Sequence, residues 1–235
     1  MDNYTFLKTA AKRNNFDVRL WQTAKGAHMA LYPNLNTNDP VYRELLRDLR
    51  FRRALSLAIH RYEINQVVYF RLVEESNNTV LREGPLYRPK YQSDWIDFDL
   101  EAANRLLDEL GLEQRDDRGV RLMSDGRPLE IMIQTAGEST EQTDVLELIH
   151  DSWLQAGIKL YSVPSTREVF RNRIFSGEAI MSIWSGLENA IPTAESSPKD
   201  LAPTSKSCGF PGRLPPENNA FVAFRESSWT TTSSS

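Results

Sequence analysis

Residues 48–61, DLRFRRALSLAIHR, decide how the rest of the chain folds. Their apolar side chains recur at i, i+3, i+4, i+7 and i+8, which is the spacing of one helix face: Phe51, Ala54, Leu55, Ala58 and Ile59. The stretch holds no Gly or Pro, and Asp48 is placed to cap the first free amides. The pattern predicts a helix over 48–61 whose polar residues face outward: Arg50, Arg52, Arg53 and His60. A second short helix is expected over 62–69 after a sharp break.

The same stretch resembles a segment of the family 5 extracellular solute-binding proteins, the peptide and nickel receptors of ABC importers. The family pattern is Asp-x-x-hydrophobic-Arg-x-Ala-x-x-x-Ala-Ile-x-Arg, which reads here as Asp48, Phe51, Arg52, Ala54, Ala58, Ile59 and Arg61. His60 stands where the family usually has Asp. In the family this segment opens the large C-terminal lobe, so the resemblance implies a mostly architectural role.

A second segment, residues 99–111 (DLEAANRLLDELG), carries the same resemblance. Asp99 is placed as the helix N-cap and Gly111 as its end, and one apolar face is expected inside: Ala102, Leu106, Leu107 and Leu110. The family has Tyr-Asp-Pro before a Leu-Leu-x-x-x-Gly helix at the matching place. Phe98-Asp99-Leu100 stands there in this chain, so the first-turn proline is absent.

The chain before residue 48 is expected to be short elements joined by turns. Residues 4–14 are typical of a short amphipathic helix, and residues 17–21 alternate as a strand does. A second extended piece is expected over 27–32. The Asn- and Pro-rich residues 33–40 then form a turn-rich connector.

After residue 111 the predicted strands and helices alternate. The series is a hairpin over 119–135 turning at Asp125-Gly126, a helix over 141–155, a strand over 158–163, a helix opened by the capping box Ser165-x-x-Glu168 and running to Phe175, and a strand over 179–184. The 141–155 helix is expected to turn Val145, Leu148, Ile149 and Leu154 inward. Strand, helix and strand in succession predict a right-handed parallel crossover. Such alternation is typical of an α/β lobe with a mixed sheet.

The resemblance implies a specific fold class and division of the chain. The fold class is α/β, namely the C-terminal lobe of a two-lobe, periplasmic-binding-protein-like fold of class II, with a mixed sheet flanked by helices. Residues 1–40 are then the end of the first lobe and the hinge, and residues 41–204 are the C-terminal lobe. Residues 205–235 are expected to be a divergent, disordered tail, because prolines interrupt any helix and the end, SSWTTTSSS, is of low complexity. The expected explanation is a fragment of a longer receptor, with a shifted or spliced reading frame near Ser205.

Composition excludes several classes of partner. Net charge is −4, from 28 basic and 32 acidic residues, so the overall charge of the chain does not attract nucleic acid or an anionic membrane surface. No window approaches the roughly 18 apolar residues of a membrane span. The first residues, MDNYTFLKTAAKRNN, lack the features of a secretory signal. The family is periplasmic or extracytoplasmic, whereas the chain as written is expected to be cytoplasmic.

The sequence gives no support for catalysis. The paired carboxylates Asp116-Asp117 and Glu74-Glu75 adjoin turn residues and are typical of a solvated surface. No Gly-x-Ser-x-Gly elbow, phosphate loop or zinc signature is present, and Cys208 is the lone cysteine. The chain is therefore expected not to be an enzyme and to need neither metal nor cofactor.

A binding site is predicted where the last strand ends, within MSIWSGLENAIP (residues 181–192). Ligands of α/β sheets collect beyond the carboxyl ends of strands. The candidate ligand-binding residues are Trp184, Ser185, Gly186, Leu187, Glu188 and Asn189. Trp184 offers a flat apolar face and Glu188 an acceptor, although Trp184 as core and Glu188 as a solvated turn residue remain open.

The resemblance implies a peptide contact that this loop does not reproduce. In peptide-binding members of the family, an Asp three residues after the matching Trp receives the ligand's α-amino group. Leu187 occupies that position here, with Glu188 next to it. Either Glu188 substitutes in a shifted loop, or the ligand is not a free-amine peptide but a glycoside, an opine-like conjugate or a metal chelate.

These observations predict the substrate-binding component, as a fragment, of an ABC importer. Its partners would be a small solute, peptide-like or else an opine, sugar or chelate, and the permease complex in the membrane, with no nucleic acid. The alternative is an orphaned lobe that acts as an interaction domain, or a non-functional truncated product. A hydrolase would need a base to converge on Ser185, and the sequence indicates none.

Overall fold

A four-stranded mixed sheet forms the centre of the fold, with strand order β1-β4-β2-β3. The strands are β1 (Ala30–Pro33), β2 (Glu130–Thr135), β3 (Lys159–Pro164) and β4 (Met181–Trp184). Strand β2 runs parallel to both β3 and β4, while β1 pairs with β4 in the antiparallel sense. The predicted mixed sheet is confirmed, as is the parallel pairing across the strand–helix–strand unit.

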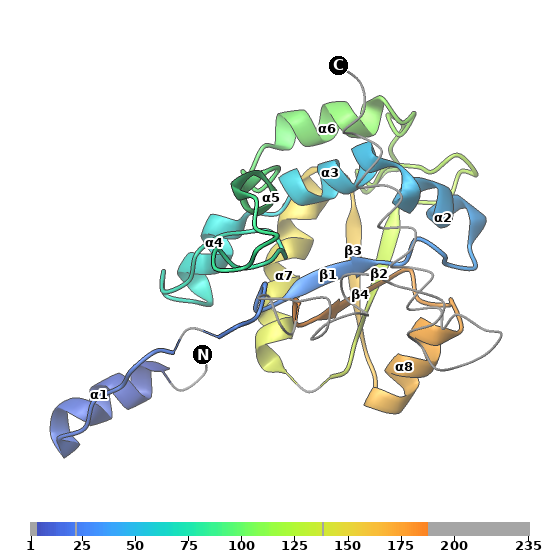
Figure 1. Cartoon of the computed structure of the whole chain (residues 1–235). Coiled ribbons are helices and arrows are strands. Elements are labelled where there is room, and N and C mark those ends of the chain that lie inside the picture. The colour runs from blue at the N-terminus through green and yellow to red at the C-terminus, as the bar shows by residue number, and fades with distance from the viewer. Residues whose placement is uncertain (1–3, 22, 138, 188–235) are drawn as a thin grey trace.

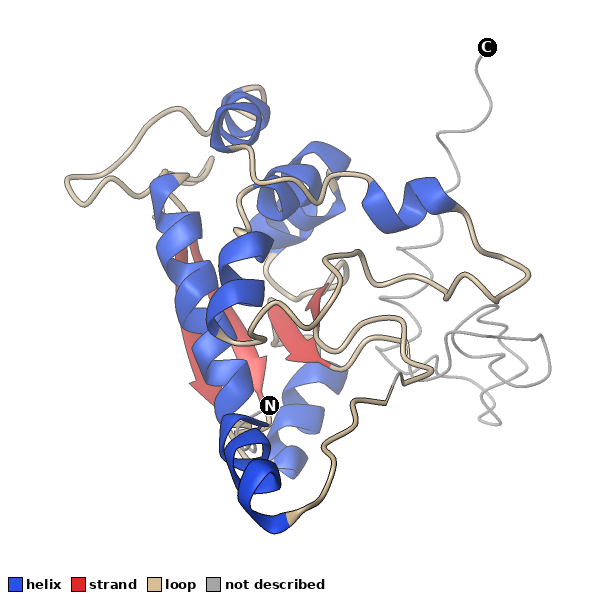
Figure 2. Cartoon of the chain, turned by 90° about the vertical axis from the view of Figure 1, so that its left-hand side faces the viewer, coloured by secondary structure: helices blue, strands red, loops and turns tan. Residues whose placement is uncertain are grey.

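The structure is a computed structural model that describes residues 4–21, 23–137 and 139–187. The helices are α1 (Tyr4–Asn14), α2 (Pro40–Arg47), α3 (Leu49–Leu57), α4 (Arg61–Val67), α5 (Pro89–Ser93), α6 (Leu100–Asp108), α7 (Thr140–Gln155) and α8 (Arg167–Phe175). Those after α1 surround the strands (Figure 1 and Figure 2). Figure 1 shows α1 projecting from the rest of the described chain, and this helix buries none of its side chains. The tail predicted for 205–235 lies outside the described residues.

The helix predicted over 48–61 is α3, which ends early at Leu57, and the second helix predicted over 62–69 is α4, which begins at Arg61. Asp48 caps α3 as expected, accepting the Arg50 N–H at 2.8 Å. The helix ends at Leu57 because Arg61 folds back, and its guanidinium donates to the Ser56 carbonyl at 2.8 Å. Arg61 itself begins α4, which His60 caps by accepting the Glu63 N–H at 3.2 Å. The break therefore precedes Arg61 instead of following it.

The apolar face predicted for this stretch is largely buried. Phe51, Ala54, Leu55 and Ala58 are buried, whereas Ile59 is half-buried, and Leu57, which the helical spacing did not include, is buried as well. Arg52 was expected to face outward, and this was wrong. Its guanidinium is half-buried and donates to the carbonyls of Leu46 at 2.7 Å and Arg47 at 2.8 Å, at the end of α2. Burial lowers the pKa of Arg52.

Two strand predictions fail because the segments have no continuous partner. Residues 17–21 form no strand, and most of their side chains are exposed. The first arm of the hairpin predicted over 119–135 pairs with the second only through an isolated bridge between Leu122 and Pro128. The second arm, β2, instead pairs with β3 and β4.

Two helix details also differ. Thr166 caps α8, accepting the Val169 N–H at 3.4 Å, whereas the predicted cap Ser165 donates its hydroxyl to the Thr135 carbonyl at 3.3 Å. In α7, Leu154 is 38% exposed although it was expected inside. The neighbouring Trp153 is fully buried, and its Nε1 donates to the Leu55 carbonyl at 3.0 Å.

Arg121 joins the ends of two helices from inside the molecule. Its guanidinium is 2% exposed and donates to the carbonyl of Ala156, just after α7, at 2.8 Å. It also donates to Asp108 at the end of α6 at 2.6 Å and to Asn104 at 2.7 Å. The carbonyl of Leu112 accepts a further bond. The partial negative charge at helix C-termini favours a cation there.

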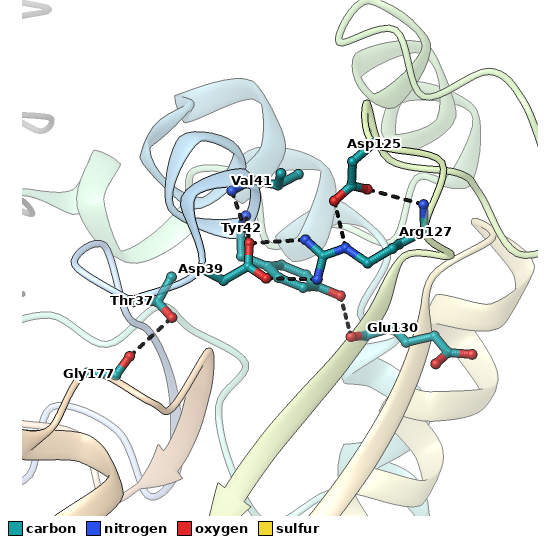
Figure 3. Close-up of polar contacts among 8 residues, drawn as sticks. All are labelled: Thr37, Asp39, Val41, Tyr42, Asp125, Arg127, Glu130 and Gly177. Atoms are coloured by element: carbon teal, nitrogen blue, oxygen red, sulfur yellow. Dashed lines mark hydrogen bonds and ion pairs between the residues drawn. The ribbon is translucent and has the colours of Figure 1, made fainter.

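The connector after β1 is tied to the turn before β2 by a carboxylate–guanidinium contact (Figure 3). Asp39 caps α2 by accepting the N–H groups of Val41 at 3.0 Å and Tyr42 at 3.1 Å. Arg127 donates to both carboxylate oxygens of Asp39, at 2.8 and 3.2 Å, and to Asp125 at 2.6 Å. The hydrogen bond from Arg127 is the main cause that lowers the pKa of Asp39.

Asp39→Ala is expected to lower the free energy of unfolding by about 1–2 kcal/mol, mainly through loss of the α2 cap, because the partly exposed ion pair adds little. The pKa of Asp39 is lowered in the folded state, so its contribution is present above the ordinary aspartate pKa and is lost as pH falls through the folded value. Urea unfolding at pH 7 and at decreasing pH measures both effects. The exposed Glu44→Ala on the same helix is the control, and an equal loss in both variants would contradict the assignment.

Candidate ligand-binding site

The carboxyl ends of β2 and β4 meet at one edge of the sheet, and β1 begins at the same edge because it runs antiparallel to β4, with Ala30 opposite Trp184. Loops beyond such strand ends are the usual place for ligands in α/β folds. A hollow of about 320 Å³ lies there, lined by Lys25, His28, Met29, Ala136, Ser139, Glu141, Gln142, Trp184 and Ser185.

Three chain segments contribute these side chains. Residues 25–29 lead into β1, residues 136–142 run from the end of β2 into the first turn of α7, and residues 184–185 are the last residue of β4 and the one after it. Helix α7 starts at the hollow, and Ser139 caps it by accepting the Gln142 N–H at 3.3 Å. The helix N-terminus brings partial positive charge to this side of the hollow.

Trp184 is half-buried at the wall of the hollow. Its ring stacks on Phe170 of α8, with 5.6 Å between centroids and 26° between planes. The Arg167 guanidinium lies 5.8 Å from the same ring centre. Trp184 is therefore held in orientation by α8 and is not a fully buried core residue.

The loop after β4 is fixed through its backbone. The Tyr32 hydroxyl donates to the Ser185 carbonyl at 2.8 Å, and the Gly186 N–H donates to the Ala27 carbonyl at 3.0 Å. The Gly26 N–H donates to the Leu187 carbonyl at 2.9 Å. The pairing of β1 with β4 thus continues beyond the ends of both strands.

A half-buried carboxylate lines the hollow from the first turn of α7. The Glu141 side chain is 12% exposed, and its Oε1 lies 3.1 Å from Nε2 of His28. The hydrogen bond from His28 is the main cause that lowers the pKa of Glu141, and the Tyr69 hydroxyl contributes to the same effect. Burial, reinforced by Glu141, raises the pKa of Tyr69, so its hydroxyl remains a donor. The hollow therefore presents an ionised carboxylate at neutral pH.

The structure brings together part of the predicted site. Trp184 and Ser185 line the hollow, whereas Gly186 and Leu187 hold the loop by backbone contacts. Glu188 and Asn189 lie outside the described residues. A ligand contact by any of these residues stays a prediction.

The sequence reasoning missed Lys25, His28, Ser139, Glu141 and Gln142. The strand-exit argument applies equally to the segment after β2, and it would have indicated Ser139, Glu141 and Gln142. His28 and Lys25 carry no local signal, because only the pairing of β1 with β4 places them at this edge.

Other features of the described residues give no second site. A shallow hollow of about 620 Å³ lies on α6 and the segment after it, lined by Glu101, Asn104, Arg105, Asp108, Glu109 and Glu113, away from the strand ends. Within the described ranges, no group of three or more His, Cys, Asp or Glu side chains could hold a metal ion. None of the helices described has the length and apolar character that crossing a membrane requires.

Comparison with known proteins gives consistent matches. The sequence model for "Bacterial extracellular solute-binding proteins, family 5 Middle" matches residues 2–206. A search of curated proteins found no match. Among solved structures, "oligopeptide-binding protein OppA" is 31% identical with a TM-score of 0.76, over 87% of this chain and 32% of that one. The chain therefore spans about a third of the length of this relative.

Two more distant structures show the same fold. The periplasmic binding protein MelB from Agrobacterium fabrum, in complex with stachyose, is 17% identical with a TM-score of 0.66, over 96% of this chain and 37% of that one. NikA from Brucella suis, in complex with Fe(III)-EDTA, is 16% identical with a TM-score of 0.62, over 95% of this chain and 46% of that one. The predicted periplasmic-binding-protein-like fold is confirmed.

Glu141→Gln is expected to weaken the dependence of stability on acid pH. The pKa of Glu141 is lowered in the folded state, so the ionised group stabilises the fold above the ordinary glutamate pKa, and this contribution is lost as pH falls through the folded value. Unfolding free energy measured from pH 7 down to pH 3 should therefore fall less steeply in the variant. The exposed Glu147→Gln on α7 should behave like the unmodified chain. A pH profile unchanged by Glu141→Gln would refute the His28–Glu141 interaction.

Proposed function

The chain belongs to the bacterial extracellular solute-binding proteins of family 5, and from this membership we propose that it takes part in capturing a small solute for an ABC importer. The observation that carries the proposal is the hollow at the carboxyl ends of β2 and β4, with Trp184 on one wall and an ionised Glu141 on another. Family members bind their solutes and do not transform them, so we propose a binding role without a chemical step.

We propose a peptide-like solute as the ligand. The relative that is 31% identical is named an oligopeptide-binding protein, whereas the structures with stachyose and Fe(III)-EDTA are less than 20% identical. The lining supports a polar ligand with an apolar part. Glu141 accepts hydrogen bonds, Lys25 donates them, and Met29 and Trp184 offer apolar surface.

We further propose that the described residues belong to two parts of a receptor. Residues 1–40 would be the end of the first lobe and the hinge, and residues 41–204 would be the C-terminal lobe. Closure of two lobes over a ligand, followed by docking on a membrane permease, is a hinge motion of a known kind. In this proposal the hollow is a part of the ligand site to which residues 25–29, at the end of the first lobe and hinge, and the C-terminal lobe both contribute. The receptor acts outside the cytoplasm.

The exposed apolar side chains near the start of the chain favour a second candidate, an interaction domain. Phe6 is 72% exposed, Leu20 52% and Trp21 87%. Exposed apolar side chains on one segment are typical of a surface that packs on another protein. Sizing of the purified chain separates the two candidates, because an interaction domain of this kind should assemble with itself or a partner whereas a receptor lobe should remain monomeric.

Thermal unfolding with a panel of short peptides, oligosaccharides and metal chelates tests the proposed function. A ligand that binds only the folded state at about 100 times its Kd adds about 2.7 kcal/mol, which raises Tm by roughly 5 °C or more. A peptide is expected to produce this shift. A shift with saccharides or chelates alone would show that the ligand is not peptide-like. No shift with any probe, in a chain that unfolds cooperatively, would refute binding.

Trp184→Ala should abolish most of the ligand-induced shift, because the indole forms one wall of the hollow. Trp95→Ala is the matched control. Trp95 is 42% exposed and packs under the Arg53 guanidinium at 4.4 Å, and it does not line the hollow. An equal loss of the shift in both variants would contradict the placement of the ligand.

A further inference from the structure

Three segments far apart in the sequence touch behind the ligand hollow. They are residues 26–27, 78–79 and 186–187. They approach so closely that a Cβ atom built on Gly26 or Gly186 would clash with a neighbouring segment. A Cβ added at Gly186 would lie 2.5 Å from the Ala27 nitrogen and 2.4 Å from Oδ1 of Asn78. A Cβ added at Gly26 would lie 2.5 Å from the Thr79 carbonyl oxygen. No side chain fits between the segments, so Asn78 lies directly against the backbone of the loop after β4.

We propose that Asn78 is a positioning residue for the ligand site: its side-chain amide fixes the loop of residues 184–187 and so sets the shape of the hollow. The Asn78 Oδ1 accepts the Leu187 N–H at 2.9 Å. Its Nδ2 lies 3.4 Å from the Tyr32 hydroxyl, which itself donates to the Ser185 carbonyl at 2.8 Å. The inference rests on the proposed function only in taking the hollow as the ligand site.

The contact replaces a missing backbone partner. Beyond Trp184 the sheet pairing continues through Gly186 to Ala27 and through Gly26 to Leu187. The Leu187 N–H donates to the Asn78 side chain and to no backbone carbonyl of the described residues. A partly buried N–H without an acceptor is costly, so the loop is stable in this position only while an acceptor stands at residue 78.

The neighbouring asparagine does a different task in the same segment. Asn77 donates through Nδ2 to the Asp94 carbonyl at 2.6 Å and to the Tyr91 carbonyl at 3.3 Å. Its own N–H donates to the Gln92 carbonyl at 3.0 Å. Asn77 thus fastens the segment to α5 and its end, whereas Asn78 extends from that anchored segment to the loop after β4. The two side chains give a matched pair of variants.

Hydrogen exchange at the Leu187 amide tests the proposal without any ligand. Asn78→Ala should raise the exchange rate of this amide at least about fivefold, because its acceptor is removed. Asn78→Asp retains an acceptor oxygen and should keep the rate within about twofold of the unmodified chain. Asn77→Ala should lower Tm yet leave Leu187 protected. If Asn78→Ala does not fold, Asn78→Ser serves instead. Its hydroxyl is too short to reach the Leu187 N–H, so the same rise in exchange is expected.

Ligand affinity provides the second readout. For a peptide that shifts the Tm of the unmodified chain, Asn78→Ala should weaken Kd by about five- to tenfold, while Asn78→Asp and Asn77→Ala stay near the original value. Unchanged Leu187 exchange in Asn78→Ala, or an equal rise in Asn77→Ala, would overturn the proposal. Failure of every probe to bind the unmodified chain would count against the proposed function alone, since the exchange measurement decides the role of Asn78 independently.

Discussion

The antiparallel pairing of β1 with β4 is the constraint on which the rest of this structure depends. It joins residues 30–33 to residues 181–184, two segments separated by most of the described chain. Because β4 is also parallel to β2, the pairing brings the start of β1, the end of β2 and the end of β4 to one edge. His28 then meets Glu141, and both lie beside Trp184.

The pairing is reinforced at both of its ends. On the side of the hollow, Gly26 and Ala27 continue it to Leu187 and Gly186. On the other side, the Asn34 N–H donates to the Ile180 carbonyl at 2.9 Å and the Asn34 side chain to the Ala179 carbonyl at 2.8 Å. Thr37 and Asn38 reach Gly177 just after α8, as Figure 3 shows for Thr37. The Asn-rich connector therefore does more than turn the chain, since its side chains hold the segment after β1 against the segment before β4.

Helix caps and hydrophobic spacing, which depend on residues close together in the sequence, predicted most of the helices. Asp48 and Asp99 cap helices where their spacing indicated, and the inward face of α3 is largely that of the hydrophobic pattern. The failures share a cause. Residues 17–21 alternate like a strand yet have no partner, and Arg52 is drawn inward by the open carbonyls at the end of α2. Such outcomes depend on neighbours that are distant in sequence or that belong to another element.

The candidate site likewise contains residues that the local sequence predicts and residues that it does not. Trp184 and Ser185 could be predicted, because the end of a strand is a local property with a known consequence for ligands. The partnership of His28 and Glu141 could not, because residues on different elements come together only through the order of strands in the sheet. The family resemblance implied a mixed sheet but no strand order, and His60 and Leu187 depart from the family pattern.

Arg121 shows how the fold treats charge in two environments. Surface pairs such as Arg82–Glu74, each about two-thirds exposed, are screened as the ionic strength of the solution rises. The Arg121 guanidinium, which is 2% exposed and shared between the ends of α6 and α7, is largely beyond the reach of dissolved ions. Lysine would not replace it, because one ammonium cannot direct donors to four acceptors in a planar fork. The junction of these two helices is therefore expected to be less sensitive to salt than an exposed pair such as Arg82–Glu74.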